Sequence, residues 1–249
     1  MSVGKTYVHA GRRRAIVRLN ALGLGAAIGP GLGTALLAGK AAAQSPGAAS
    51  CRLIPTATAG PFPLLAFLGT KAAVRRDIRE SRPGVPLTLN MRLQNIDAGC
   101  APIRNAAVYI WHCDRDGGYS GYNGRENGDH RGGTFLRGIQ MSDERGQVSF
   151  ITIFPGWYPG RITHIHFQVY LRDARGGRAA ATSQLAFPDE VVRSVYATSA
   201  YPRGQNGTVR DIADDGLFSD NGRYQTASVT GSITSGLVAS LDVGISAGG

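Results

Sequence analysis

Residues 154–170 read F-P-G-W-Y-P-G-R-I-T-H-I-H-F-Q-V-Y, and the rest of the chain is organised around this stretch. From His164 onward, polar and apolar side chains alternate. Successive side chains of a β-strand point to opposite faces, so the pattern predicts a strand with His164 and His166 on one face and a core on the other. Two imidazoles side by side are the start of a metal site, but they need further donors. Tyr158 is one candidate, because the Pro/Gly-rich turn could fold it back over the histidines.

A second unusual stretch, residues 108–122, reads V-Y-I-W-H-C-D-R-D-G-G-Y-S-G-Y. Its first four residues are a β-rich run, and the Asp/Gly-rich sequence that follows predicts a turn. Tyr119 and Tyr122 then stand in a polar, glycine-rich loop, where an aromatic side chain gains little from core burial. Taken alone, this stretch favours two plain loop tyrosines, although either of them could be a fourth donor.

Together the two stretches resemble the intradiol ring-cleavage dioxygenases, the family of catechol 1,2-dioxygenase and protocatechuate 3,4-dioxygenase. In that family, an apolar strand that ends in Trp leads to a glycine turn and a tyrosine. The corresponding residues here are Trp111 and Tyr119. A second tyrosine, Tyr158, follows a Pro-Gly pair and precedes the His-x-His pair of His164 and His166. The sequence motifs W-H-C-D and P-G-W-Y-x-G-R most resemble those of the exported, single-domain branch of the family.

The resemblance covers about residues 51–245 and implies a non-haem Fe(III) site with Tyr119, Tyr158, His164 and His166 as metal ligands. Phenolate oxygens with neutral imidazoles suit ferric iron better than zinc or cuprous copper. Two phenolates and a hydroxide also neutralise a trivalent ion, and an uncompensated buried charge would be costly. The resemblance further implies that a catechol binds as a dianion and displaces Tyr158, and that O2 is inserted between the two hydroxylated carbons to give a muconate-type diacid.

Two more catalytic residues follow from the resemblance. Arg161 stands where the family places an arginine beside the substrate ring, and its fixed charge would stabilise negative charge that develops there. Gln184, in S-Q-L-A-F-P, matches a glutamine near the same pocket. Outside this motif, Arg161 would be read as an ordinary surface arginine and Gln184 as a polar residue on a strand face.

Other polar residues near the two stretches have simpler interpretations. His112 is expected to make a structural hydrogen bond, and His130 to be a loop histidine. Tyr122 rivals Tyr119 for the role of first phenolate, but the Trp-to-Tyr spacing of the family favours Tyr119. A cupin-like metal site would need a later glutamate and histidine, and no histidine follows His166.

The first 45 residues read as a cleaved export signal. A basic region is followed by a Leu/Ala/Gly-rich run over residues 19–38 and by three alanines at residues 41–43. The sequence R-R-A-I-V-R from Arg13 to Arg18 resembles the twin-arginine pattern, whose export route carries folded proteins. A membrane anchor is the alternative, but six Gly and Pro residues interrupt the run, so we expect no stable span after cleavage. The expected location is periplasmic or extracellular.

The distribution of charge argues against nucleic acid as a partner. The formal net charge is +10, but residues 1–45 hold six basic and no acidic residues. The remaining chain therefore has 21 basic against 17 acidic residues, and no basic stripe with interleaved aromatics appears in it.

Residues 46–249 are expected to form one catalytic domain of the all-β class. Regular short strands with Gly/Pro turns predict a β-sandwich with long loops and one or two short helices. The expected strands include residues 87–94, 148–154, 224–230 and 237–245, and the expected helix covers residues 189–197.

Three cysteines in an exported chain allow one internal disulfide and three pairings. We expect Cys51 to pair with Cys100, since both flank loops outside the strongest strand patterns, which leaves Cys113 as a thiol.

One functional alternative remains at this point. A non-catalytic exported β-sandwich that binds aromatics or cell-wall material could keep the iron site as a relic. The helical dimerisation segment of the catechol 1,2-dioxygenases has no counterpart here, because the leader occupies its place. The sequence allows a homo-oligomer, and the resemblance specifies no particular catechol.

Overall fold

A computed structural model describes residues 51–173, 177–218 and 222–247. The export signal expected over residues 1–45 lies outside these residues. Within them, no helix is long and apolar enough to cross a bilayer.

The first sheet is organised around its longest strand, β1 (Pro86–Asn95). Leu87, Leu89, Met91 and Leu93 are buried, while the side chains between them are partly or fully exposed, as the alternation predicts. The sheet runs in the order β10-β11-β1-β2, and β7 also pairs with β1. Its other strands are β2 (Ala101–Pro102), β7 (Gln147–Ile153), β10 (Ser228–Ser232) and β11 (Gly236–Ile245).

The second sheet carries the two histidines on its central strand β8 (His164–Tyr170). Its order is β6-β3-β8-β9, and every pairing in it is antiparallel. All seven residues of β8 are buried, because the sandwich core covers one face and loops cover the other. The remaining strands of this sheet are β3 (Ala107–Trp111), β6 (Arg137–Met141) and β9 (Ala181–Ala186).

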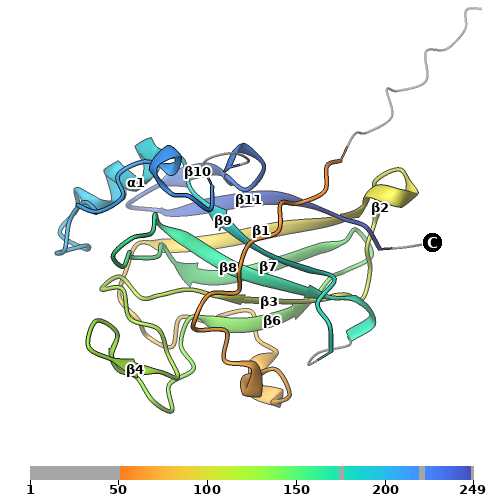
Figure 1. The fold of residues 1–249 in the computed structure, drawn as a ribbon, viewed down its shortest axis with the longest axis horizontal. Coiled ribbons are helices and arrows are strands. Elements are labelled where there is room, and N and C mark those ends of the chain that lie inside the picture. Colours follow the sequence, from red (N-terminus) through yellow and green to blue (C-terminus); the bar gives the residue numbers. More distant parts are fainter. Residues whose placement is uncertain (1–50, 174–176, 219–221, 248–249) are drawn as a thin grey trace, which may run out of the picture. The chain divides into compact units, whose positions relative to one another are not determined.

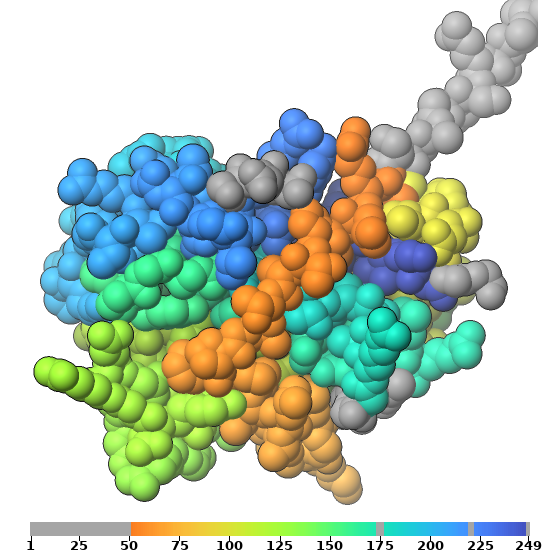
Figure 2. Space-filling model, viewed as in Figure 1, coloured from red at the N-terminus to blue at the C-terminus, as the bar shows by residue number. Residues whose placement is uncertain are grey.

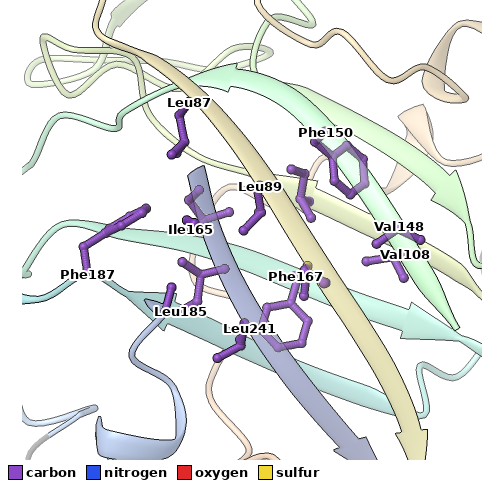
Figure 3. Packing of buried hydrophobic residues seen from close by; sticks show 14 of the residues in the cluster. Leu87, Leu89, Val108, Val148, Phe150, Ile165, Phe167, Leu185, Phe187 and Leu241 are labelled. Atoms are coloured by element: carbon purple, nitrogen blue, oxygen red, sulfur yellow. The ribbon is translucent and has the colours of Figure 1, made fainter. Parts of the chain in front are cut away.

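The two sheets pack face to face, as the layers in Figure 1 show. Leu87, Leu89 and Leu241 of the first sheet meet Ile165 and Phe167 of β8 in one hydrophobic cluster (Figure 3). The all-β sandwich expected from the sequence is therefore confirmed.

Long loops and short helical turns complete the domain. The expected helix is α1 (Asp189–Tyr196), which follows Pro188 and buries Val192, Val195 and Tyr196. A small hairpin of β4 (Asn123–Gly124) and β5 (Gly128–Asp129) lies in the loop between β3 and β6. Among the described residues, short 3-10 turns cover Leu65–Phe67, Lys71–Ala73, Ile96–Ala98, Leu171–Asp173, Ile212–Asp214 and Gly222–Tyr224.

The strand expected over residues 224–230 begins later, at Ser228. The cause is a non-local hydrogen-bond pattern. Gln225 N–H closes a turn on the Gly222 carbonyl, and the Gln225 side chain donates to the Gln184 carbonyl of β9. These bonds hold the segment against β9 before it can join the first sheet.

The described chain begins with a segment that hydrogen-bonds to both sheets. Ile54 N–H donates to Gly244 of β11, and Ala57 N–H donates to Thr182 of β9. A disulfide joins Cys51 to Cys100 with a Cα–Cα distance of 5.7 Å, which confirms the expected pairing. The segment, orange in Figure 2, continues across the visible face.

Candidate metal centre

The histidine face of β8 lies outside the sandwich core. His164 and His166 are almost fully buried, and their Nε2 atoms are 3.0 Å apart. Their neighbours Ile165 and Phe167 point into the core on the other face. The strand alternation thus places both imidazoles in one polar cluster under the loops.

The turn before β8 folds Tyr158 back onto this cluster. Its hydroxyl is 3.2 Å from His164 Nε2. Gly156 makes the turn possible, because a Cβ atom there would collide with the carbonyl oxygens of Asp114 and Arg115. Gly156 N–H instead donates to Asp114 O at 3.1 Å, so the turn is joined to the loop after β3.

That loop carries Tyr119 into the same cluster. The Tyr119 ring centroid is 5.8 Å from that of Tyr158 and 6.2 Å from that of His166. Tyr119 is fully buried, and its hydroxyl has no hydrogen bond of good geometry, although Tyr158 is close enough to affect its pKa. The four residues predicted as metal ligands therefore lie together.

Aromatic side chains form the walls of the cluster. Trp111, opposite His166 on the neighbouring strand, stacks on its imidazole at 5.0 Å. Phe62 stacks on Tyr119 at 4.6 Å. Gly60 has a φ of +66°, and a Cβ atom there would be 3.0 Å from His166 Cε1. A glycine therefore lets the chain pass close to the ring.

The backbone fixes the tautomer of His164. Its Nδ1–H donates to the Ile162 carbonyl at 2.6 Å, so the lone pair of the neutral ring is on Nε2, which points at Tyr158 and His166. Burial lowers the pKa of His164 to about 3 and that of His166 well below its usual range. Both imidazoles are therefore uncharged near neutral pH, as metal ligands must be.

The pKa values of the two phenols shift in the opposite direction. Burial raises the pKa of Tyr158 to about 12 and that of Tyr119 well above its usual value. The guanidinium of Arg161 acts against this rise at Tyr158. Without a cation, both phenols keep their protons near neutral pH. A strongly charged metal ion would displace those protons and bind the phenolate oxygens. Two phenols, one with an unpartnered hydroxyl, and two neutral imidazoles fit a hard trivalent metal ion.

Arg161 and Gln184 lie beside the donors and contact each other. Arg161 Nη2 donates to Gln184 Oε1 at 2.5 Å, and Gln184 is opposite His166 in the β8–β9 register. Arg161 Nε also donates to Asp215 Oδ2 at 2.9 Å. Asp215 was missed by the sequence analysis, because a single Asp 54 residues from its partner leaves no local signal.

The competing residues have the simpler roles. His112 Nδ1–H donates to the Cys113 carbonyl, and His112 Nε2 accepts from the Thr152 hydroxyl at 2.7 Å, so it makes the structural hydrogen bonds expected. The Tyr122 hydroxyl accepts from Leu64 N–H at 2.9 Å. His130 lies next to the hairpin β4–β5 and is half-buried.

The chain is similar to known proteins in both sequence and structure. The family described as Dioxygenase matches residues 66–203. An intradiol ring-cleavage dioxygenase from Tetranychus urticae is 31% identical, with a TM-score of 0.67 and coverage of 78% of this chain and 95% of that one. The search of curated proteins found no match.

Two bacterial structures share the fold. The dioxygenase domain of a carbohydrate-binding fusion protein from Streptomyces sp. SirexAA-E is 24% identical, with a TM-score of 0.52 and coverage of 78% of this chain and 97% of that one. Hydroxyquinol 1,2-dioxygenase from Pseudomonas putida DLL-E4 is 18% identical, with a TM-score of 0.51 and coverage of 79% and 67%. The family match and the 31% identity show that the chain belongs to the intradiol ring-cleavage dioxygenases.

Proposed function

We propose that the protein is a non-haem Fe(III) intradiol dioxygenase. It inserts both atoms of O2 between the two hydroxylated carbons of a catechol-type aromatic and yields a muconate-type diacid. The observation that carries the proposal is the convergence of Tyr119, Tyr158, His164 and His166 in one buried cluster. These four side chains would hold the iron, which when bound supplies the Lewis acidity and the electron-accepting capacity that catechol oxidation needs.

The two tyrosines are suited to different tasks. Tyr119 is fully buried and packed against Phe62, so it is held in place. Tyr158, in the loop between β7 and β8, is only partly buried. This difference supports Tyr158 as the ligand that leaves when substrate binds. Since burial raises the pKa of Tyr158 to about 12, its phenolate would be basic enough to take a proton from a catechol hydroxyl.

Arg161 and Gln184 supply the fixed polar groups of the site. The Arg161 guanidinium lies near Tyr158 and hydrogen-bonds to Gln184, which itself donates to the Thr58 carbonyl at 2.7 Å. A positive charge held in this way costs no reorganisation when negative charge develops on the substrate ring. The aromatic walls of Trp111 and Phe62 keep water from the donors on their side.

The decisive experiment is a visible absorption spectrum of the purified protein before and after addition of catechol. Tyrosinate bound to ferric iron gives a broad charge-transfer band and a red-brown colour. We expect this band to shift on addition of catechol and to fade as oxygen is consumed. A protein that stays colourless after iron loading would overturn the proposal in favour of an exported binding module for aromatics or cell-wall material.

A matched pair of variants makes the test specific. Tyr119→Phe removes a proposed ligand and should weaken the band. Tyr122→Phe removes a hydroxyl three residues away that accepts from Leu64 N–H, and it should leave the band unchanged.

We also propose that the catalytic domain, residues 46–249, acts outside the cytoplasm after its signal has been removed. The support is the twin-arginine-like sequence of residues 13–18 and the disulfide between Cys51 and Cys100, a bond typical of oxidising compartments.

A further inference from the structure

Asp215 is a buried carboxylate in a loop that is otherwise open to solvent. It is 2% exposed, while its neighbours Asp214 and Gly216 are exposed. The loop follows the 3-10 turn Ile212–Asp214 and leads to the buried ring of Phe218. Burying an ionised carboxylate is costly unless it is paired and hydrogen-bonded, so its contacts should explain its position.

Those contacts are complete and point at the site. Asp215 Oδ2 accepts from Arg161 Nε at 2.9 Å and from the backbone N–H of Ile162 at 2.8 Å. Asp215 Oδ1 accepts from Leu217 N–H at 2.9 Å. The carboxylate is thus fixed to its own loop by one oxygen and to the turn before β8 by the other. An arginine bound at Nε cannot rotate its guanidinium plane without breaking that bond.

The bond from Nε to Asp215 fixes the direction of the remaining N–H donors of Arg161. Nη2 meets Gln184 Oε1, and the Gln184 amide donates to Thr58 O. A single hydrogen-bonded chain therefore runs from Asp215 through Arg161 and Gln184 to Thr58, and it joins four separate segments of the sequence. A second branch passes through Ile162, whose N–H binds Asp215 and whose carbonyl binds His164 Nδ1–H.

We propose that Asp215 is the positioning residue of the site, which holds the Arg161 guanidinium in the orientation where it meets the substrate ring. Asp215 contacts none of the four donor side chains through a hydrogen bond, so it acts through Arg161. The inference rests on the proposed function, from which it takes the role of Arg161 beside the substrate.

The same loop offers a matched control. Arg193 and Asp211 form an ion pair of 2.8 Å, but their side chains are 56% and 47% exposed, against 15% and 1% for Arg161 and Asp215. An exposed ion pair of this kind contributes little to the stability of the folded protein. Asp211→Asn therefore makes the same chemical change as Asp215→Asn, at a position that does not reach the site.

The first measurement follows arginine Nε–H resonances by NMR in the metal-free protein, with Arg161→Lys to assign the signal of Arg161. In the unaltered protein, we expect Arg161 Nε–H to exchange with solvent at least about tenfold more slowly than Arg193 Nε–H. Asp215→Asn should shift the Arg161 resonance and speed its exchange, and Asp211→Asn should not. An unshifted resonance in Asp215→Asn would overturn the proposal. If that variant does not fold, equal exchange of the two arginines in the unaltered protein overturns it.

The second measurement uses the iron-loaded protein. Asp215→Asn should keep its iron, but its turnover of catechol should fall about 10- to 100-fold. That range is typical when a residue that supports a metal site from outside the ligand set is lost. Adding Arg161→Lys should cause little further loss, because both changes remove the same oriented charge. Full turnover in Asp215→Asn, or multiplicative losses in the double variant, would overturn the role. Should the unaltered protein take up no iron and turn over no catechol, the proposed function fails, and the NMR result alone then decides whether Asp215 orients Arg161.

Discussion

Tyr119 and Tyr158 have the same side chain, but their surroundings differ. Tyr158 is partly buried after a Pro/Gly-rich turn, whereas Tyr119 is enclosed by Phe62 and the loop after β3. We predict that Tyr158→Phe keeps iron bound through the remaining donors but slows substrate chelation. Iron analysis and stopped-flow mixing with catechol would measure the two effects. Unchanged turnover would contradict the role of Tyr158 as the departing ligand.

His166 is held by contacts that leave it little freedom. Trp111 stacks on its ring, and Gly60 approaches its Cε1 atom. We predict that His166→Ala folds but loses its iron, since a neutral imidazole held in this way has no substitute nearby. His130→Ala, which alters a half-buried loop histidine, is the control and should keep iron. Full iron retention by His166→Ala would remove this residue from the site.

His112 couples stability to pH without taking part in the site. Burial lowers its pKa to about 4, from an unfolded value near 6.5. Between these values the unfolded chain binds a proton that the folded protein does not, so stability rises with pH from about 4 to 6.5 and is lost on acidification. The shifted pKa of His112 contributes on the order of 3 kcal/mol to the free energy of unfolding above pH 6.5, relative to its value below pH 4.

We therefore predict that His112→Gln is less stable than the unaltered protein near neutral pH but loses less stability on acidification. Urea unfolding of the metal-free proteins at several pH values would show this. The difference between the two curves is the informative quantity, because His164 and His166 titrate in the same direction in both proteins. Parallel curves would contradict the prediction.

At the scale of elements, the disulfide ties the first described segment to the loop after β1. Cys51 and Cys100 are separated by 49 residues, and a loop of that size gives a chain-entropy contribution of about 4 kcal/mol. We predict that replacing both residues by serine lowers the free energy of unfolding by roughly that amount. Urea titrations with and without reductant would measure it. Since Cys113 is a buried free thiol, reductant should not affect the double variant. A reductant-sensitive double variant would contradict this assignment.

Local patterns were enough to predict several elements. The alternation of Leu87 to Leu93 predicts β1, and Pro188 followed by an acidic first turn predicts α1. The pairing partners could not be predicted in the same way. β1 pairs in parallel with β11, from which it is separated by about 150 residues, and such a register leaves no mark in either strand alone. The late start of β10 had the same kind of cause, because Gln225 is held by β9.

At the scale of the whole molecule, the site gathers loops around one strand. Two short motifs contain all four proposed ligands, so the sequence was enough to bring Tyr119, Tyr158, His164 and His166 together. The surrounding contacts come from segments outside the motifs, at Gly60 and Asp215. Asp215 has ordinary surroundings in the sequence, and only the fold shows that it meets Arg161.

The last prediction concerns the full chain. If residues 13–18 direct a route for folded proteins, replacing Arg13 and Arg14 together by lysine should stop export, although the charge is unchanged. Arg12→Lys keeps the pair and is the control. In a host with a twin-arginine route, we expect the double variant to accumulate inside the cell with its Cys51–Cys100 pair reduced, and the control to appear outside with the disulfide formed. Cell fractionation with thiol labelling would distinguish the two. Equal export of both variants would point to a route that accepts any basic residue, and would contradict the twin-arginine interpretation while leaving the proposed chemistry of the domain untouched.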